Sequence, residues 1–161
     1  MAVFNMTFKN EDELKAFLLK KCQNAVAQAE QKIYAEIKST LAKFYSEFTP
    51  EEYIRTNQLL HSLVKSGVKK VGSGYVAEVY FDLSALNYEQ GVMPLQHTPE
   101  HGMYGWATWT GETVLDVAMN SGVPHGGYAV GTPVWTTSMA KLGDILELLK
   151  QKLIAQGIPI K

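Results

Sequence analysis

The sequence predicts an α+β fold, and three observations support this prediction. A helical repeat of apolar residues extends from Leu18 to Phe48, strand-like alternation surrounds a turn at 72–74, and a second helical repeat lies near the end of the chain. Helical and strand patterns in separate segments are typical of α+β domains. We expect a long N-terminal helix, an antiparallel β-hairpin or small sheet, an extended loop rich in glycine and tryptophan, and a C-terminal helix, all within a single domain over residues 1–161.

The first expected element is a helix over residues 11–47. Asn10 is a favourable cap residue, and the three acids that follow it suit the positive end of a helix dipole. Apolar residues then recur every three or four positions until Thr49 and Pro50 end the pattern. Such a helix would be roughly 50 Å long at 1.5 Å per residue, which is longer than a compact domain of this size needs.

The middle of this helix is rich in alanine, and its apolar face includes Ala25, Ala29 and Ile33. Small side chains suit the close approach of another backbone. Two interpretations remain open: the face belongs to the core of the chain, or it packs between subunits of an oligomer. If it packs between subunits, Ala29→Glu should disturb assembly more than Glu30→Ala.

The expected β region covers about residues 68–135. A short helix that ends near Gly67 precedes it, and a hairpin with its turn at Gly72–Gly74 opens it. Within the region we expect another short helix over 112–120 and an extended segment over 126–135. The C-terminal helix is expected over about 137–156, starting at a Thr-Thr-Ser cap and stopping at Gly157 and Pro159.

Composition excludes several classes of protein. The net charge of −1 draws the chain neither to nucleic acid nor to an anionic membrane, and a single cysteine, Cys22, excludes an internal disulfide. The N-terminus lacks the basic start and apolar run of a signal peptide, and no apolar stretch approaches the roughly 20 residues of a transmembrane helix. We therefore expect a protein that stays in the cytoplasm or in an assembly built there, without a membrane partner.

No lysine or arginine occurs between Val71 and Ala140, although acidic residues do. One interpretation is chance combined with a largely buried sheet. The other is an electronegative surface that DNA phosphates would not bind. The acids proposed for such a surface are Glu78, Asp82 and Glu89.

The segment HTPEHGMYGWATWTGE, residues 97–112, raises the question of a metal or catalytic site. His97 and His101 have the spacing of zinc ligands on a helix, and His125 could be a third ligand. However, Pro99 separates the first two and favours a helix start after His97, and a threonine replaces the glutamate of an HExxH motif. No nucleophile elbow, P-loop or dinucleotide fingerprint is present. We expect no metal, no cofactor and no enzymatic activity; the alternative is a small metal-dependent hydrolase that uses the three histidines.

Three segments carry a family resemblance: YIRTNQLLHSLV from Tyr53 to Val64, YVAEVYFD from Tyr75 to Asp82, and the short NYEQG that follows. The chain resembles the neck and tail-completion (head–tail joining) proteins of siphophage-like tailed bacteriophages and prophages. Their R-T-G-x-L-x-x-S segment is matched by residues 55–62, except that Asn57 stands where glycine is commonest. The pieces HG, PHGGY and PVW later in the chain are similar to recurrent pieces of the prophage versions.

This resemblance implies a structural, ring-forming subunit of the virion, assembled in the host cytoplasm, whose partners are copies of itself and neighbouring neck and tail proteins. DNA would at most pass through the ring without being bound tightly. The loop after the hairpin would then be an assembly contact, because its residues are types enriched in interfaces: Met103, Tyr104, Trp106 and Trp109. A further alternative is a cytoplasmic oligomeric binding protein with an aromatic-lined pocket.

Overall fold

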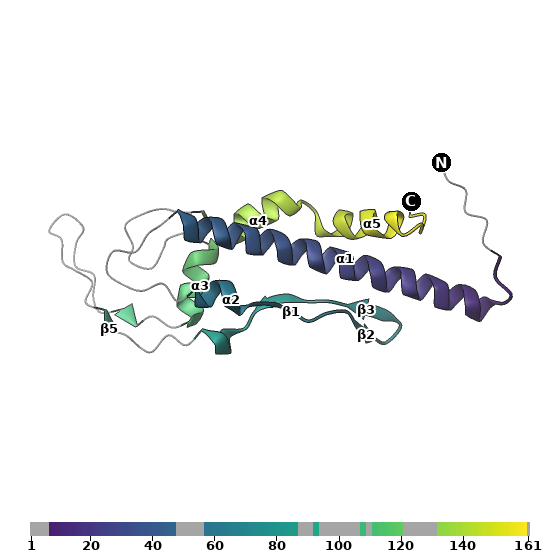
Figure 1. Ribbon diagram of the computed structural model, residues 1–161, viewed down its shortest axis with the longest axis horizontal. Coiled ribbons are helices and arrows are strands. Elements are labelled where there is room, and N and C mark those ends of the chain that lie inside the picture. Colours follow the sequence, from purple (N-terminus) through teal and green to yellow (C-terminus); the bar gives the residue numbers. More distant parts are fainter. Residues whose placement is uncertain are drawn as a thin grey trace. The chain divides into compact units, whose positions relative to one another are not determined.

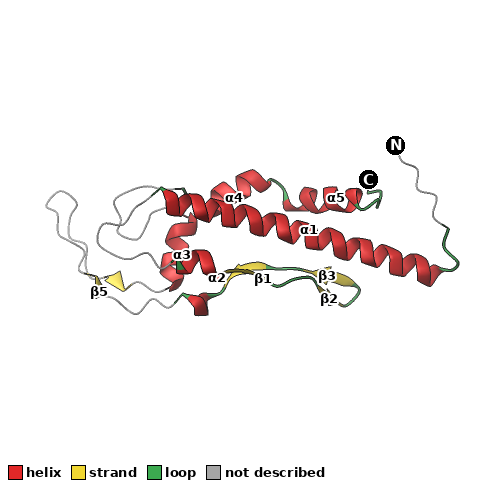
Figure 2. Cartoon of the chain, in the orientation of Figure 1, coloured by secondary structure: helices red, strands yellow, loops and turns green. Residues whose placement is uncertain are grey.

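The computed structural model describes residues 7–47, 57–86, 92–93, 107–108, 111–120 and 132–160. The helices and strands confirm the expected α+β class, with a long N-terminal helix, small antiparallel sheets and helices at the C-terminal end (Figures 1 and 2). The elements in chain order are α1 (Glu11–Ser46), α2 (Gln58–Ser62), β1 (Leu63–Lys65), β2 (Lys69–Val71), β3 (Gly74–Val76), β4 (Val79–Phe81), the 3-10 turn η1 (Leu83–Ala85), β5 (Val92–Met93), β6 (Ala107–Thr108), α3 (Gly111–Asn120), α4 (Val134–Leu142) and α5 (Ile145–Ala155).

Helix α1 starts where the sequence predicted. The side chain of Asn10 accepts a hydrogen bond from the Glu13 backbone N–H at 2.9 Å, and the Glu13 carboxylate accepts one from the Lys9 N–H at 2.7 Å. These contacts satisfy backbone donors that a helix start otherwise leaves unpaired. The helix contains 36 residues and ends at Ser46, whose hydroxyl donates to the Lys43 carbonyl.

The chain divides into two compact units, and α1 contributes residues to both. Unit one comprises Met1–Ile33, Lys65–Val79 and Leu142–Lys161; unit two comprises Tyr34–Val64 and Tyr80–Lys141. In unit one, Ala25 and Ala29 of α1 are buried. Because an alanine on an isolated helix is exposed, other parts of the chain cover these two residues.

The core of unit two is built around the C-terminal part of α1. Buried apolar side chains come from α1, α2, the start of β1, the residue after η1, α3 and α4: Ile37, Leu41, Phe44, Leu59, Leu63, Leu86, Met119 and Val134. Three small polar residues, Thr40, Ser62 and Ser138, are also fully buried there. Thr40 meets its hydrogen-bonding need locally, since its hydroxyl donates to the Glu36 carbonyl one turn earlier.

The strands form three two-stranded sheets: β1 with β4, β2 with β3, and β5 with β6. The β2–β3 hairpin is antiparallel, with Lys69 opposite Val76 and Val71 opposite Gly74. Its turn begins at Gly72, whose φ of 58° is left-handed and favours glycine. The expectation of a hairpin turning at 72–74 is therefore confirmed.

The expected strand through residues 75–82 is, however, divided in two. Residues 77 and 78 lie outside both strands, and β4 pairs with β1 instead of continuing the ladder to β2. The side chain of Ser66 explains the interruption, because its hydroxyl accepts the hydrogen bond of the Glu78 N–H at 2.9 Å. A side chain thus takes a donor that a continuous ladder would have paired with backbone.

Three sequence-based expectations about helices need correction. The short helix ends at Ser62 and not near Gly67, since residues 63–65 form β1. The single C-terminal helix expected over 137–156 is two helices, α4 and α5, separated by Gly143 with a φ of 69° and by the cap residue Asp144. The segment expected to be extended up to Trp135 is already helical at Val134, where α4 begins; residues 121–131 lie outside the described part of the chain.

Candidate functional site

Helix α5 of unit one is unusual in leaving several of its apolar side chains exposed, while Leu148, Leu149 and Leu153 are half-buried. Its sequence, ILELLKQKLIA, contains seven apolar residues among its 11, and none of the 11 is buried. Leu146 is 75% exposed, and Ile145 and Ile154 are exposed as well. A helix that is apolar on most of its sides is normally enclosed by protein. Exposed apolar surface of this kind marks a site of interaction.

The ends of α5 are well defined, so its exposure is not that of a frayed segment. At the start, the Asp144 carboxylate accepts a hydrogen bond from the Leu146 N–H at 2.8 Å. At the end, Gly157 has a φ of 84° and donates to the Ile154 carbonyl, while the Ile158 N–H donates to the Leu153 carbonyl. This pair of bonds is a Schellman motif. The helix is therefore closed at both ends by its own sequence.

The β2–β3 hairpin presents a second exposed apolar surface in unit one. Lys69 is opposite Val76, and Val71 lies two residues along the strand from Lys69, so these three side chains share one face. Val71 is 60% exposed and Val76 is 45% exposed. An isolated two-stranded hairpin is only marginally stable in water, and additional packing on such a face would stabilise it.

The base of this hairpin is attached to α1 by a buried carboxylate. Glu30 is only 6% exposed, and its Oε1 accepts a hydrogen bond from the Gly67 N–H at 2.8 Å. Next to it, the Lys65 ammonium donates to the Gln31 side chain at 2.5 Å. Gly67 has a φ of 69°, a conformation that favours glycine. These contacts hold the connection between β1 and β2 against α1.

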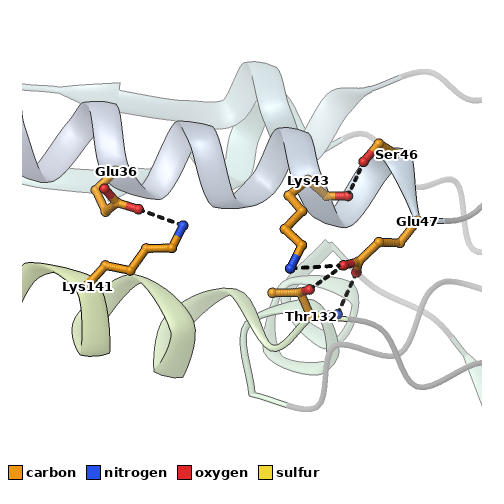
Figure 3. Close-up of polar contacts among 6 residues, drawn as sticks. All are labelled: Glu36, Lys43, Ser46, Glu47, Thr132 and Lys141. Carbon is orange, nitrogen blue, oxygen red and sulfur yellow. Dashed lines mark hydrogen bonds and ion pairs between the residues drawn. The ribbon is translucent and has the colours of Figure 1, made fainter.

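In unit two, polar contacts join the C-terminal part of α1 to the segment that leads into α4 (Figure 3). The Glu47 carboxylate accepts hydrogen bonds from the Thr132 hydroxyl at 2.6 Å and from the Thr132 N–H at 2.9 Å, and Lys43 lies 3.4 Å from it. The hydroxyl bond, more than any other contact, holds the pKa of Glu47 below its ordinary value. Further along α4, the Lys141 ammonium lies 3.0 Å from the Glu36 carboxylate.

The segment that carries the sequence resemblance contains a left-handed residue. Asn57 has a φ of 57°, the only positive φ of a non-glycine residue in the described part of the chain. Asparagine and glycine are the residue types that adopt this conformation most readily. Asn57 therefore retains the backbone geometry that glycine would provide at the same position of the motif.

The two other described positions of that motif are both buried and bonded to each other. Leu59 is in the core of unit two, and the hydroxyl of Ser62 donates to the Leu59 carbonyl at 2.9 Å. The Ser62 carbonyl in turn accepts a hydrogen bond from the Asp82 N–H at 2.8 Å. Ser62, the last residue of the motif and of α2, thus connects the end of this helix to Asp82, the residue after β4. Arg55 and Thr56 lie outside the described residues.

The alanine-rich face of α1 is placed in the core of unit one. Ala25 is 0% exposed and Ala29 is buried, whereas Ile33 is half-buried. For the two alanines, this burial agrees with the intramolecular interpretation of the face, because no other chain is needed to cover them. Glu30, whose change to alanine was expected to disturb assembly less than Ala29→Glu, is itself buried and hydrogen-bonded, so it cannot serve as a neutral control.

The predicted acidic residues differ in their surroundings. Glu78 is exposed, whereas Asp82 is half-buried and caps η1, accepting hydrogen bonds from the hydroxyl and the N–H of Ser84 at 2.6 and 3.0 Å. These bonds, the hydroxyl first, hold the pKa of Asp82 below its ordinary value. Its carboxylate therefore has a local structural role. Glu89 lies outside the described residues.

The remaining predicted site residues, those of the aromatic loop and the three histidines, also lie outside the described part of the chain: Met103, Tyr104, Trp106, Trp109, His97, His101 and His125. Among the residues that are described, no group of three or more histidine, cysteine or carboxylate side chains could hold a metal ion. None of the described helices combines the length and the apolar character needed to cross a bilayer.

Comparison with known families identifies one relationship. The family model YomN matches residues 10–155. The chain belongs to the YomN family. The match runs from the cap residue of α1 to the last residue of α5, so the YomN family region takes in every helix and strand described above. No curated protein and no solved structure matches the chain.

Sequence reasoning did not single out α5 or the hairpin face as candidate interaction surfaces. A signal was present in both segments. ILELLKQKLIA has apolar residues on more sides than one core-facing stripe requires, and the hairpin places valines on a face that also carries a lysine. Only the burial of each side chain could show that these apolar residues remain uncovered.

Proposed function

We propose that the protein is a structural subunit of a tailed bacteriophage, a ring-forming neck or tail-completion protein that joins the head to the tail. The observation that carries this proposal is the geometry of the 57–62 segment. The single departure from the neck-protein motif, Asn57, has a φ of 57°, which suits the glycine it replaces. The matching positions Leu59 and Ser62 are buried and hydrogen-bonded to each other. Described motif positions that serve backbone geometry and packing, Asn57, Leu59 and Ser62, fit a structural subunit.

The uncovered apolar surface of unit one supports the same proposal. Helix α5 and the β2–β3 hairpin both expose large aliphatic side chains in the single chain. A subunit that functions only within a ring can leave such surface exposed, because neighbouring copies cover it after assembly. The proposed partners are therefore copies of this chain and the adjoining neck and tail proteins, with DNA passing through the ring and not bound tightly.

The test is to locate the protein in phage particles and to remove it. An affinity-tagged copy, labelled and imaged by electron microscopy in particles of the encoding phage, should lie at the junction of head and tail. Disruption of the gene should yield filled heads and separate tails, and expression of the intact protein in trans should restore joined particles. Absence of the protein from purified infectious particles would overturn the proposal.

The same experiments separate the alternatives. A metal-dependent hydrolase that uses His97, His101 and His125 would lose its function when His97 and His101 are changed to alanine. A neck subunit with the same double substitution should still restore joined particles, because a structural role does not need the two imidazoles as metal ligands. Restoration of particles by the double variant therefore supports the structural role, and its failure with a folded protein counts against it.

A further inference from the structure

We propose that unit one associates head to tail with a second copy of the chain, the start of α5 in one copy packing on the exposed face of the β2–β3 hairpin in the next. The α5 surface consists of Asp144, Ile145, Leu146 and Glu147, and the hairpin surface consists of Lys69, Val71 and Val76, which share one face of the ladder. This inference rests on the proposed ring-forming function and names the contact that builds the ring.

The two surfaces are matched in apolar character. Each contributes two exposed aliphatic side chains: Ile145 and Leu146 on α5, and Val71 and Val76 on the hairpin. Leu146 is the most exposed of the four, and the two valines are neighbours on one face of the hairpin ladder. Burial of these four side chains together would remove from water the three most exposed large apolar side chains among the described residues of unit one, Leu146, Val71 and Val76, together with Ile145.

The two surfaces are also complementary in charge. The α5 surface has two exposed acids: Asp144, which caps the helix, and Glu147, whose carboxylate lies 3.9 Å from the Lys150 ammonium in a solvent-exposed pair. The hairpin surface has one exposed lysine, Lys69, a second exposed lysine, Lys70, lies next to it on the other face of the ladder, and no acid occurs between Gly67 and Ala77. Opposite charges around apolar centres favour the pairing of unlike surfaces, and like charges disfavour the pairing of either surface with itself.

The placement of the surfaces excludes their pairing within one chain. Within unit one, α5 and the hairpin lie on opposite sides of α1 (Figure 1). Each surface is therefore free to contact the other surface of a second copy. A contact between two different surfaces of identical subunits is heterologous, and it continues from copy to copy until the rotation closes a ring. An isologous pair would instead stop at a dimer.

Cysteine cross-linking tests the geometry directly. In a Cys22→Ser background, Val71→Cys and Leu146→Cys are introduced together, and mild oxidation should produce a ladder of covalent oligomers. Mixed single variants should give only dimers that contain one chain of each kind. Two results would overturn the inference: the Leu146→Cys variant cross-linking mainly to itself, or no ladder from the double variant under conditions in which it forms oligomers.

Charge exchange provides an independent measurement. Lys69→Glu and Glu147→Lys should each weaken association, measured by sedimentation, on the order of tenfold, and their combination should restore most of the loss. Lys20→Glu, an exposed lysine on α1 of the same unit, is the matched control and should have little effect. Restoration of association by the double exchange cannot come from misfolding, whereas additive losses of association in the double variant would contradict the contact.

The result also distinguishes this contact from the proposed function. If particles contain the protein at the neck but these variants assemble normally, the contact is wrong and the proposed function stands.

Discussion

The carboxylate of Glu30, buried in the middle of α1, accepts a hydrogen bond from the Gly67 N–H at 2.8 Å. This single contact joins two segments that are 37 residues apart in the sequence and holds the base of the β2–β3 hairpin on the long helix. A buried carboxylate without such a donor would be strongly unfavourable. The attachment of the hairpin to α1, which the contact of Lys65 with Gln31 also supports, therefore depends in part on an acid that sequence periodicity does not distinguish from its exposed neighbours.

Glu30→Ala should accordingly destabilise the protein by about 1–3 kcal/mol, because the Gly67 N–H loses a charged acceptor in a partly buried position. Glu30→Gln keeps an acceptor oxygen and should cost less. The free energy of unfolding in urea measures both effects. Glu11→Ala, an exposed acid on the same helix, is the control. Equal stability of the Glu30→Ala and Glu11→Ala variants would show that the Gly67 contact is unimportant.

The left-handed conformation of Asn57 predicts an unequal response to two substitutions. Asn57→Gly should be neutral within a few tenths of a kcal/mol or slightly stabilising, because glycine adopts a positive φ without strain. Asn57→Ala should destabilise by about 1–2 kcal/mol, because its Cβ opposes this conformation and its side chain cannot compensate with local hydrogen bonds. Thermal unfolding of the two variants checks the difference, and an alanine variant as stable as the glycine variant would contradict it.

Ser62 and Ser138 form a matched pair of fully buried serines in unit two. The Ser62 hydroxyl donates to the Leu59 carbonyl, whereas the Ser138 Oγ has no hydrogen-bond partner among the described residues. Ser62→Ala should therefore cost about 1 kcal/mol. Ser138→Ala should be neutral or stabilising by up to about 1 kcal/mol, because it removes an unpaired hydroxyl from an apolar site. Urea unfolding of both variants gives the comparison, and the opposite order would refute it.

The stability contributed by Glu47 should depend on pH. The Thr132 hydroxyl lowers the pKa of Glu47 in the folded state below its ordinary value of 4.5. A lowered folded pKa means that the contribution is fully present above pH 4.5 and is lost as the pH falls through the folded pKa. The difference in stability between wild type and Glu47→Ala should shrink over that range. An NMR titration of the Glu47 carboxylate should show its pKa rising in Thr132→Val; an unchanged value would contradict the assignment.

The segment without lysine or arginine predicts weak binding to duplex DNA. The unmodified protein should give no gel shift near physiological salt, because few phosphates would be neutralised. Glu78→Lys with Glu89→Lys should add salt-sensitive binding without preventing oligomer formation. Asp82 is not changed in this test, since it caps η1. Glu11→Lys with Asp12→Lys, two exposed acids at the start of α1, is the control pair. Tight binding by the unmodified protein would contradict this prediction.

Short-range sequence signals predicted the structure correctly where the conformation of a segment depends only on its own residues. The start of α1 follows from Asn10 and the acids after it, the hairpin turn follows from Gly72, and the α+β class follows from two periodicities in separate segments. The division between α4 and α5 was also encoded locally, by Gly143 and the cap residue Asp144, but the apolar periodicity on either side concealed it.

The sequence by itself thus determined the start of α1, the hairpin turn and the class of the fold, because a helix cap, a left-handed glycine and periodicity act within a few residues of the chain. Only the tertiary structure decided that Ala25 is covered within one chain, that Glu30 is buried against Gly67, and that Leu146 remains exposed. The physical reason is that burial depends on which distant segment packs on a side chain. An alanine, a glutamate and a leucine at helical spacing look the same in sequence whether the neighbouring surface is protein or water.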